Sequence, residues 1–165
     1  MATTTQRITP FFWFNDQAEE AVNFYTGIFP NSKILKATRY TKEVAQMAGQ
    51  KEGSIMTVDF ILDGQHFSGI NGGPMYKFTE ALSLVIHCDT QDEVDHYWDR
   101  LRAGGDERAQ QCGWLKDKFG VSWQIVPNAL FEILGDPDPN RARRASEAMM
   151  GMKKLDIAAL RRAAD

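Results

Sequence analysis

Cysteine and histidine are scarce in this sequence: its 165 residues include two cysteines and three histidines. Cys88 and Cys112 lie far apart and form no Cys-x-x-Cys pair, so the sequence does not indicate a disulfide framework. A chain without such a framework is typical of a reducing compartment, and we expect this protein in the cytoplasm.

Long apolar runs and concentrated positive charge are also missing. No apolar stretch approaches the roughly 20 residues that a membrane-spanning helix needs, and the polar segment Met1–Arg7 lacks the apolar region of a signal peptide. The net charge is −3, and basic residues are concentrated only near the C-terminus. We therefore expect neither a membrane nor a nucleic acid among the partners.

The composition that remains is that of an ordinary globular protein, with 43% hydrophobic and 25% charged residues. The first half of the chain is predicted to form a strand, a helix and three strands. Apolar residues recur at helical spacing from Gln17 to Phe29, and Asn15 or Asp16 can cap that helix. Asp63-Gly64 is a hairpin signal, and the polar, aperiodic segment Thr41–Gly53 is expected to be a mobile loop. The four expected strands are Pro10–Phe14, Lys33–Tyr40, Ser54–Leu62 and His66–Asn71.

The second half repeats this order after a linker at Pro74–Glu80. A helix is expected at Gln91–Arg102, with Asp89 or Thr90 as its cap. Shifting the first helix by 72 positions aligns Val22 with Val94 and Tyr25 with Tyr97, which indicates an internal repeat. The expected strands are Ala81–His87, Ala109–Cys112, Trp114–Lys116 and Val121–Val126. The tail, Asp136–Asp165, is predicted to be helical, with Arg141, Arg143 and Arg144 on a solvated face.

The pattern therefore predicts an α+β fold of two βαβββ modules followed by C-terminal helices. The first module spans residues 7–73, the second 80–127, and the helical tail 128–165. A curved sheet with a helix on its outer face leaves a concave inner face. Two such modules side by side would form a cleft, which is the usual kind of ligand site.

Three segments carry a family resemblance: Phe11 to Ile34, Ile70 to Trp98, and Cys112 to Pro127, which reads CGWLKDKFGVSWQIVP. They resemble the PhnB-like branch of the vicinal oxygen chelate superfamily, which includes glyoxalases, bleomycin-resistance proteins and dioxygenases. The resemblance implies the glyoxalase/bleomycin-resistance-like fold, a small-molecule ligand and a homodimer. This branch is often labelled 3-demethylubiquinone-9 3-methyltransferase.

The residues do not support methyl transfer as chemistry. Gly69, Gly72 and Gly73 form no Gly-x-Gly-x-x-Gly motif, and no convincing helix follows them. Binding of S-adenosylmethionine normally needs such a glycine-rich turn between a strand and a helix. Methyl transfer to a quinone precursor therefore rests on the family label alone.

The resemblance also identifies the positions at which metal-using members hold an ion, usually with His or Glu. None of these positions carries His, Asp, Glu or Cys here, and a divalent ion needs strongly donating ligands. We therefore expect no metal and no cofactor, unless His66 and His87 converge. In chain order the positions fall at Pro10 or Phe11, Ser68 or Phe67, Ser83, and Gln124.

An aromatic cleft suits a planar or amphipathic small molecule, although each aromatic residue could equally belong to the core. Gln124 could orient a ligand or bridge two strands. Cys112 could be a nucleophile or a plain buried thiol, and Asp59 a general base or the partner of a neighbouring strand. No catalytic residue is identified. The expected pocket residues are Phe12, Phe14, Phe67, Ser68, Asn71, Ser83, His87, Trp114 and Gln124.

The first functional hypothesis is a metal-independent small-molecule-binding protein, akin to bleomycin-resistance proteins. The alternative is a metal-dependent enzyme of the glyoxalase, epimerase or dioxygenase kind. The third is the methyltransferase that the family label names.

Overall fold

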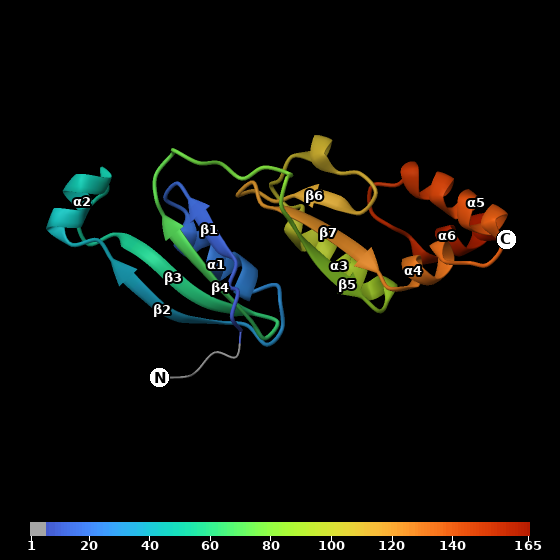
Figure 1. The fold of residues 1–165 in the computed structure, drawn as a ribbon, viewed down its shortest axis with the longest axis horizontal. Coiled ribbons are helices and arrows are strands. Elements are labelled where there is room, and N and C mark those ends of the chain that lie inside the picture. Colours follow the sequence, from blue (N-terminus) through green and yellow to red (C-terminus); the bar gives the residue numbers. More distant parts are fainter. Residues whose placement is uncertain (1–5) are drawn as a thin grey trace. The chain divides into compact units, whose positions relative to one another are not determined.

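The computed structural model describes residues 6–165, so the first five residues of the polar N-terminal segment lie outside it. Contacts divide the chain into two compact units, one ending at Phe78 and one running from Thr79 to Asp165 (Figure 1). Each unit contains one sheet with helices, of four strands in the first and three in the second. The predicted α+β class, with glyoxalase-like modules and C-terminal helices, is confirmed.

The first unit has a mixed sheet in the order β1-β4-β3-β2. Strand β1 pairs with β4 in parallel, and the other neighbours are antiparallel. Asp63 and Gly64 have φ values of 45° and 77° between β3 and β4, which confirms the predicted hairpin turn. The elements are β1 Phe11–Phe14, α1 Ala18–Thr26, β2 Lys33–Arg39, α2 Lys42–Ala48, β3 Ile55–Leu62 and β4 Gln65–Asn71.

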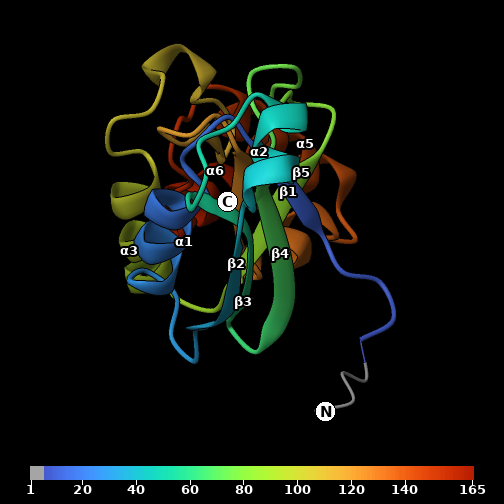
Figure 2. The same cartoon turned by 90° about the vertical axis from the view of Figure 1, so that its left-hand side faces the viewer.

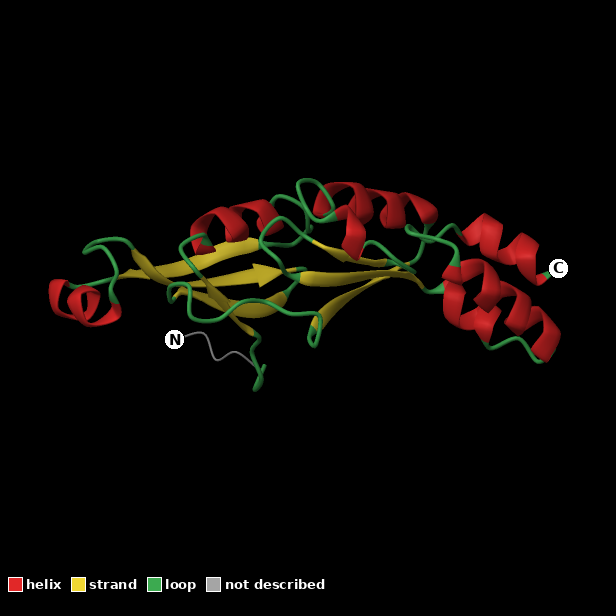
Figure 3. Cartoon of the chain, turned by 90° about the horizontal axis from the view of Figure 1, so that it is seen from above, coloured by secondary structure: helices red, strands yellow, loops and turns green. Residues whose placement is uncertain are grey.

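Helix α1 covers one face of this sheet, and α2 lies beyond the ends of β2 and β3 (Figures 2 and 3). The helix buries a stripe at helical spacing that includes Ala18, Val22 and Tyr25. Neither Asn15 nor Asp16 caps it. The backbone N–H of Ala18 instead donates to Asn71 Oδ1 on β4 at 2.8 Å. The cap therefore comes from the sheet, which fixes the helix to one face.

The segment that was expected to be a mobile loop contains helix α2. Thr41 accepts a hydrogen bond from Val44 N at its start, and Gly49 ends it in the left-handed conformation with φ 66°. These are ordinary cap signals. Only Ala45 of this helix is buried, so the apolar periodicity that usually reveals a helix is missing.

The second unit has a sheet in the order β5-β7-β6, with β5 parallel and β6 antiparallel to β7. This reproduces the β1-β4-β3 part of the first sheet. Thr90 caps α3, as one of the two predicted alternatives, by accepting from Glu93 N. The elements are β5 Ser83–Cys88, α3 Gln91–Leu101, a 3-10 turn Glu107–Ala109, β6 Trp114–Lys116 and β7 Ser122–Pro127.

The expected strand Ala109–Cys112 does not form. Cys112 and Gly113 have φ values of 51° and 84°, so they make a tight two-residue turn. The pairing across this turn stops after the single bridge between Gln111 and Trp114. The fourth strand of the repeat is reduced to one residue pair, because the chain enters the turn from a 3-10 helix.

The tail forms helices α4 Ala129–Leu134, α5 Pro139–Met150 and α6 Ile157–Ala164. A cluster of Val126, Leu130, Leu155 and Leu160 attaches them to the end of β7. The predicted solvated arginine face is only partly correct. Arg143 forms an exposed ion pair with Glu147, whereas Arg141 and Arg144 bind groups at the C-terminal end of α6. Over residues 6–165, no helix combines the length and the apolar character that crossing a bilayer requires.

Candidate ligand-binding faces

In each sheet, a helix packs against one face. The centre of the opposite face is not covered by a helix, and we call this opposite face the open face. In the first unit, Phe11 pairs with Ser68 and Trp13 with Ile70 across β1 and β4. Cross-strand partners share a face, and Asn71, which caps α1, belongs to the other one. The first open face comprises Phe11, Trp13, Thr57, Asp59, Ile61, His66, Ser68 and Ile70.

The polar groups of the first open face are partly satisfied within the sheet. Ser68 Oγ donates to Asp59 Oδ1 at 2.6 Å, so Asp59 has the strand-neighbour partner that was one of its two predicted roles. Thr57 shares a 2.6 Å hydrogen bond with Thr38 on β2. His66 Nε2 is buried and lacks a hydrogen-bond partner among the residues described.

The glycines near this face serve the packing of Trp13. A Cβ on Gly72 would lie 2.2 Å from the Trp13 ring, so only glycine fits there. Trp13 Nε1 donates to Gly73 O at 2.9 Å, and the Tyr76 ring meets the indole edge to face at 4.9 Å. The helix that comes next in the chain is α3, which begins only at Gln91. This segment therefore does not have the strand-turn-helix form of a nucleotide-binding loop.

Four of the expected pocket residues lie on the helix-covered face of the first unit. Phe12, Phe14 and Phe67 are 4%, 2% and 7% exposed, and Phe67 stacks on Phe60 with ring centroids 5.6 Å apart. Asn71 is equally buried, and its Nδ2 donates to Ile55 O at 3.1 Å. A ligand would reach these side chains only by displacing the core, so their placement favours the packing alternative.

The expected pocket residues of the second unit all lie on its open face; they are Ser83, His87, Trp114 and Gln124. Register places Gln124 beside Trp114 and Val85, and His87 beside Val126. Gln124 Nε2 donates to Ser83 Oγ at 2.9 Å, which joins β7 to β5. The second open face comprises Ser83, Val85, His87, Trp114, Lys116, Ser122, Gln124 and Val126.

The donor set at the family's metal positions does not fit a divalent ion. In the first unit Phe11 and Ser68 are direct cross-strand partners, and neither Phe11 nor the alternative Pro10 has a side chain that can coordinate an ion. In the second unit the amide of Gln124 and the hydroxyl of Ser83 already bind each other. Neither pair offers an anionic or imidazole donor. Within residues 6–165, no group of three or more His, Cys, Asp or Glu residues gathers in a way that could hold an ion.

The two cysteines differ in environment. Burial, with help from Glu93 and Asp89, raises the pKa of the Cys88 thiol to about 12. Cys112 Sγ lies 3.4 Å from Met149 O and 3.8 Å from Met150 Sδ. These neighbours are neutral and offer no base that could activate a nucleophile, which agrees with the plain-thiol alternative for Cys112.

Comparisons with known proteins agree on one family. The model of the family described as 3-demethylubiquinone-9 3-methyltransferase matches residues 6–126. The PhnB protein of Bacillus cereus, which bears the same methyltransferase description, is 36% identical in sequence. Its TM-score is 0.64, and the match covers 74% of this chain and 99% of that one. None of the curated proteins that were compared matches this chain.

Two more distant structures share the fold alone. Protein PA1353 of Pseudomonas aeruginosa is 18% identical with a TM-score of 0.60, and the match covers 74% of this chain and 98% of that one. The fosfomycin resistance protein FosX of Mesorhizobium loti is 16% identical with a TM-score of 0.54, and the match covers 81% and 100%. In both, the match extends over nearly the whole of the other chain.

Proposed function

Since this chain belongs to the family described as 3-demethylubiquinone-9 3-methyltransferase, in the PhnB-like branch of the vicinal oxygen chelate superfamily, we propose that it binds a small molecule without a metal ion. One observation carries the proposal. The positions at which the resemblance places ion ligands are Pro10 or Phe11, Ser68 or Phe67, Ser83 and Gln124. Ser68 already donates to Asp59, and Gln124 donates to Ser83. Neutral groups of this kind orient an organic ligand more readily than they dehydrate a cation.

The open faces also suit a planar or amphipathic molecule. The first combines the aromatic residues Phe11 and Trp13 with the polar groups of Ser68 and His66. The second places Trp114 beside Gln124. Aromatic rings provide contact area, and a few polar groups set the orientation of the ligand. We therefore propose Ser68, Ser83, His87, Trp114 and Gln124 as ligand contacts, with Phe11, Trp13 and His66 added.

The metal part of the proposal is tested on protein purified without chelators. Its divalent metal content is measured, and Mn²⁺ and Zn²⁺ are then titrated into it by calorimetry. We expect less than a stoichiometric amount of metal and no saturable heat. A Ser83→His/Gln124→Glu variant serves as the positive control, because it introduces an imidazole and a carboxylate that lie on one face. A tightly held divalent ion in the wild-type protein would overturn the proposal and favour a metal-dependent enzyme.

The ligand part is tested with 8-anilinonaphthalene-1-sulfonate, a planar amphipathic probe whose fluorescence rises on binding. Trp114→Ala and Phe11→Ala should each weaken its binding several-fold, since each removes aromatic contact area from an open face. Met47→Ala is the matched control, because Met47 is 89% exposed on α2 and belongs to neither set of open-face residues. Equal weakening by all three substitutions would show that the probe binds exposed apolar surface in general.

Methyl transfer is tested directly by titrating S-adenosylmethionine in the calorimeter. The family description is its support, while Gly72 and Gly73 serve the packing and the backbone hydrogen bond of Trp13. We expect no heat of binding. A saturable heat of binding with S-adenosylmethionine would support the methyltransferase hypothesis.

We also propose a homodimer in the cytoplasm. Edge strand β2 leaves Ile34 and Leu35 42% and 46% exposed, and exposed apolar edges are often covered by a second copy. The two cysteines are both free thiols, as a reducing compartment would keep them. Light scattering after size-exclusion chromatography measures the molar mass in solution. A mass equal to that of one chain would refute the dimer.

A further inference from the structure

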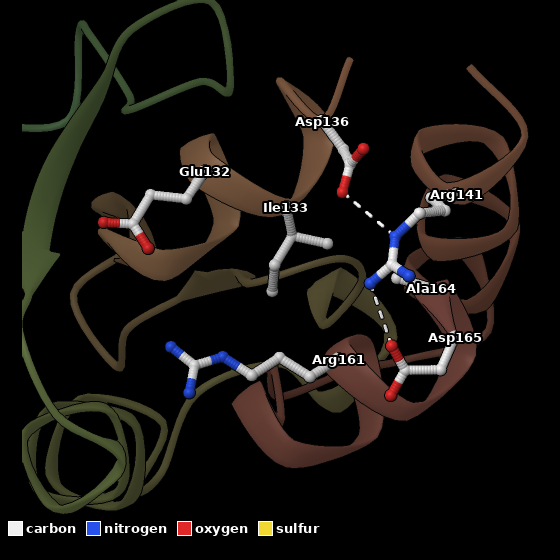
Figure 4. A pocket seen from close by; sticks show the side chains of 7 residues that line it. All are labelled: Glu132, Ile133, Asp136, Arg141, Arg161, Ala164 and Asp165. Carbon is white, nitrogen blue, oxygen red and sulfur yellow. Dashed lines mark hydrogen bonds and ion pairs between the residues drawn. The ribbon is translucent and has the colours of Figure 1, made fainter. Parts of the chain in front are cut away.

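The C-terminal helices contain a cavity of about 310 Å³ that belongs to neither open face (Figure 4). The family model ends at residue 126, so α4, α5 and α6 lie outside it. The cavity is at the lower end of the range for small-molecule sites. Its lining combines charged side chains of both signs with the apolar residues Ile133 and Ala164.

The charges at one end of this cavity are satisfied within the protein. Arg141 Nε donates to Asp136 at 3.0 Å, and its terminal nitrogen donates to Asp165 at 2.8 Å. Both contacts raise the pKa of Arg141. Arg144 donates to the carbonyls of Ala163 and Ala164. Two arginines of α5 thus fix the last turn of α6, and with it the wall of the cavity.

The charges at the other end are exposed to solvent. Arg161 on α6 and Glu132 on α4 both line the cavity, yet the side chain of neither forms a hydrogen bond or ion pair with another described residue. Figure 4 shows the two side chains extending along the same side of the cavity, with Ile133 beside them. One unpaired cation and one unpaired anion therefore face a shared space that has an apolar wall.

We propose that this cavity binds a small zwitterion of the amino-acid class. The carboxylate of the ligand binds the Arg161 guanidinium, whose planar donors match it in two parallel hydrogen bonds. The ammonium group binds the Glu132 carboxylate, and the carbon chain packs against Ile133.

The test uses ω-amino acids of increasing length, because the series reports the spacing of the two charges. Glycine, β-alanine, 4-aminobutyrate and 5-aminopentanoate are titrated into the full chain and followed by two-dimensional NMR. Propionate and propylamine carry one charge each and serve as ligand controls. We expect shifts in the tail resonances, with at least one zwitterion bound roughly tenfold or more tightly than either single-charge compound.

Three variants locate the site. Arg161→Gln and Glu132→Gln should each weaken the best zwitterion roughly tenfold or more, since each removes one charge-assisted contact. Neither side chain has a partner to lose, so the variants keep their fold. Arg143→Gln is the matched control, because Arg143 pairs with Glu147 on α5 outside the cavity lining, and it should leave the affinity unchanged.

Several results would overturn the proposal. They are the absence of tail shifts with every amino acid, equal affinity for propionate and the best zwitterion, and equal loss of affinity in Arg161→Gln and Arg143→Gln. None of them affects the proposed function of the open faces, which lie on the sheets and are probed with a different compound.

Discussion

Replacement of Asn71 with alanine separates a packing role from a ligand-binding role for this residue. The side chain is 7% exposed and satisfies two buried backbone groups, the N–H of Ala18 at 2.8 Å and the carbonyl of Ile55 at 3.1 Å. Alanine leaves both without partners. Each unsatisfied buried group costs about 1–3 kcal/mol, so the free energy of unfolding of this unit should fall by about 2–6 kcal/mol.

The loss should be confined to the first unit, which hydrogen exchange can resolve. At 1.4 kcal/mol per factor of ten, slowly exchanging amides in α1 and β3 should exchange roughly 30 to 20,000 times faster. Amides in α3 of the second unit serve as the internal reference. Because small domains are commonly only 5–15 kcal/mol stable, the same change should lower the urea midpoint at which the first unit unfolds.

Ser68→Ala is the matched control on the same strand and the opposite face. Ser68 loses one hydrogen bond, to Asp59, so its effect on stability should be about 1 kcal/mol, while its effect on probe binding should exceed that of Asn71→Ala. The reasoning fails if Asn71→Ala unfolds within 1 kcal/mol of the wild type. It fails equally if Asn71→Ala abolishes probe binding while the sheet keeps its protection from exchange.

Three further predictions concern the second unit. Asp117→Asn should lower the free energy of unfolding by about 1–3 kcal/mol, measured by urea titration, because the buried carboxylate accepts hydrogen bonds from Phe119 N, Val121 N and the Trp123 indole; an unchanged midpoint would contradict this. A thiol reagent at pH 8 should label Cys112 and spare Cys88 in the folded protein, since thiolate is the reactive form and the pKa of Cys88 is raised to about 12. The same raised pKa favours the folded state below the ordinary thiol value of 9.0 and should cost stability as pH rises from there toward 12.

The choice of sheet face shows where sequence reasoning succeeds and where it stops. Ser83 and Gln124 interrupt apolar strands, and they mark one face of the second sheet together with His87 and Trp114. The run FFWF at 11–14 offers no such mark, because both sets of alternate residues are aromatic. A shift of one residue exchanges the two faces of a strand, so the sequence could not separate Phe12 and Phe14 from Phe11 and Trp13.

What resolves the ambiguity is a contact between distant segments. Asn71 caps α1 across 53 positions of sequence, and this bond assigns its face of β4 to the helix. Helix α2 is difficult to predict for a different reason, since its signals are the caps at Thr41 and Gly49 and its only buried residue is Ala45. Caps alone, without an apolar stripe, are too common in loops to predict a helix.

Helix α4 connects the two proposed sites of the second unit. Two adjacent residues of α4 face the two sites. The Phe131 ring centroid lies 6.0 Å from that of His87 on the open face, and Glu132 lines the tail cavity. The same end of that face is anchored to the tail through Val126 and Leu130. A ligand in the cavity can alter the open face only if α4 has two alternative placements and the ligand binds one of them more tightly than the other. The residue through which such coupling would act is Phe131, because it contacts the open face without lining the cavity.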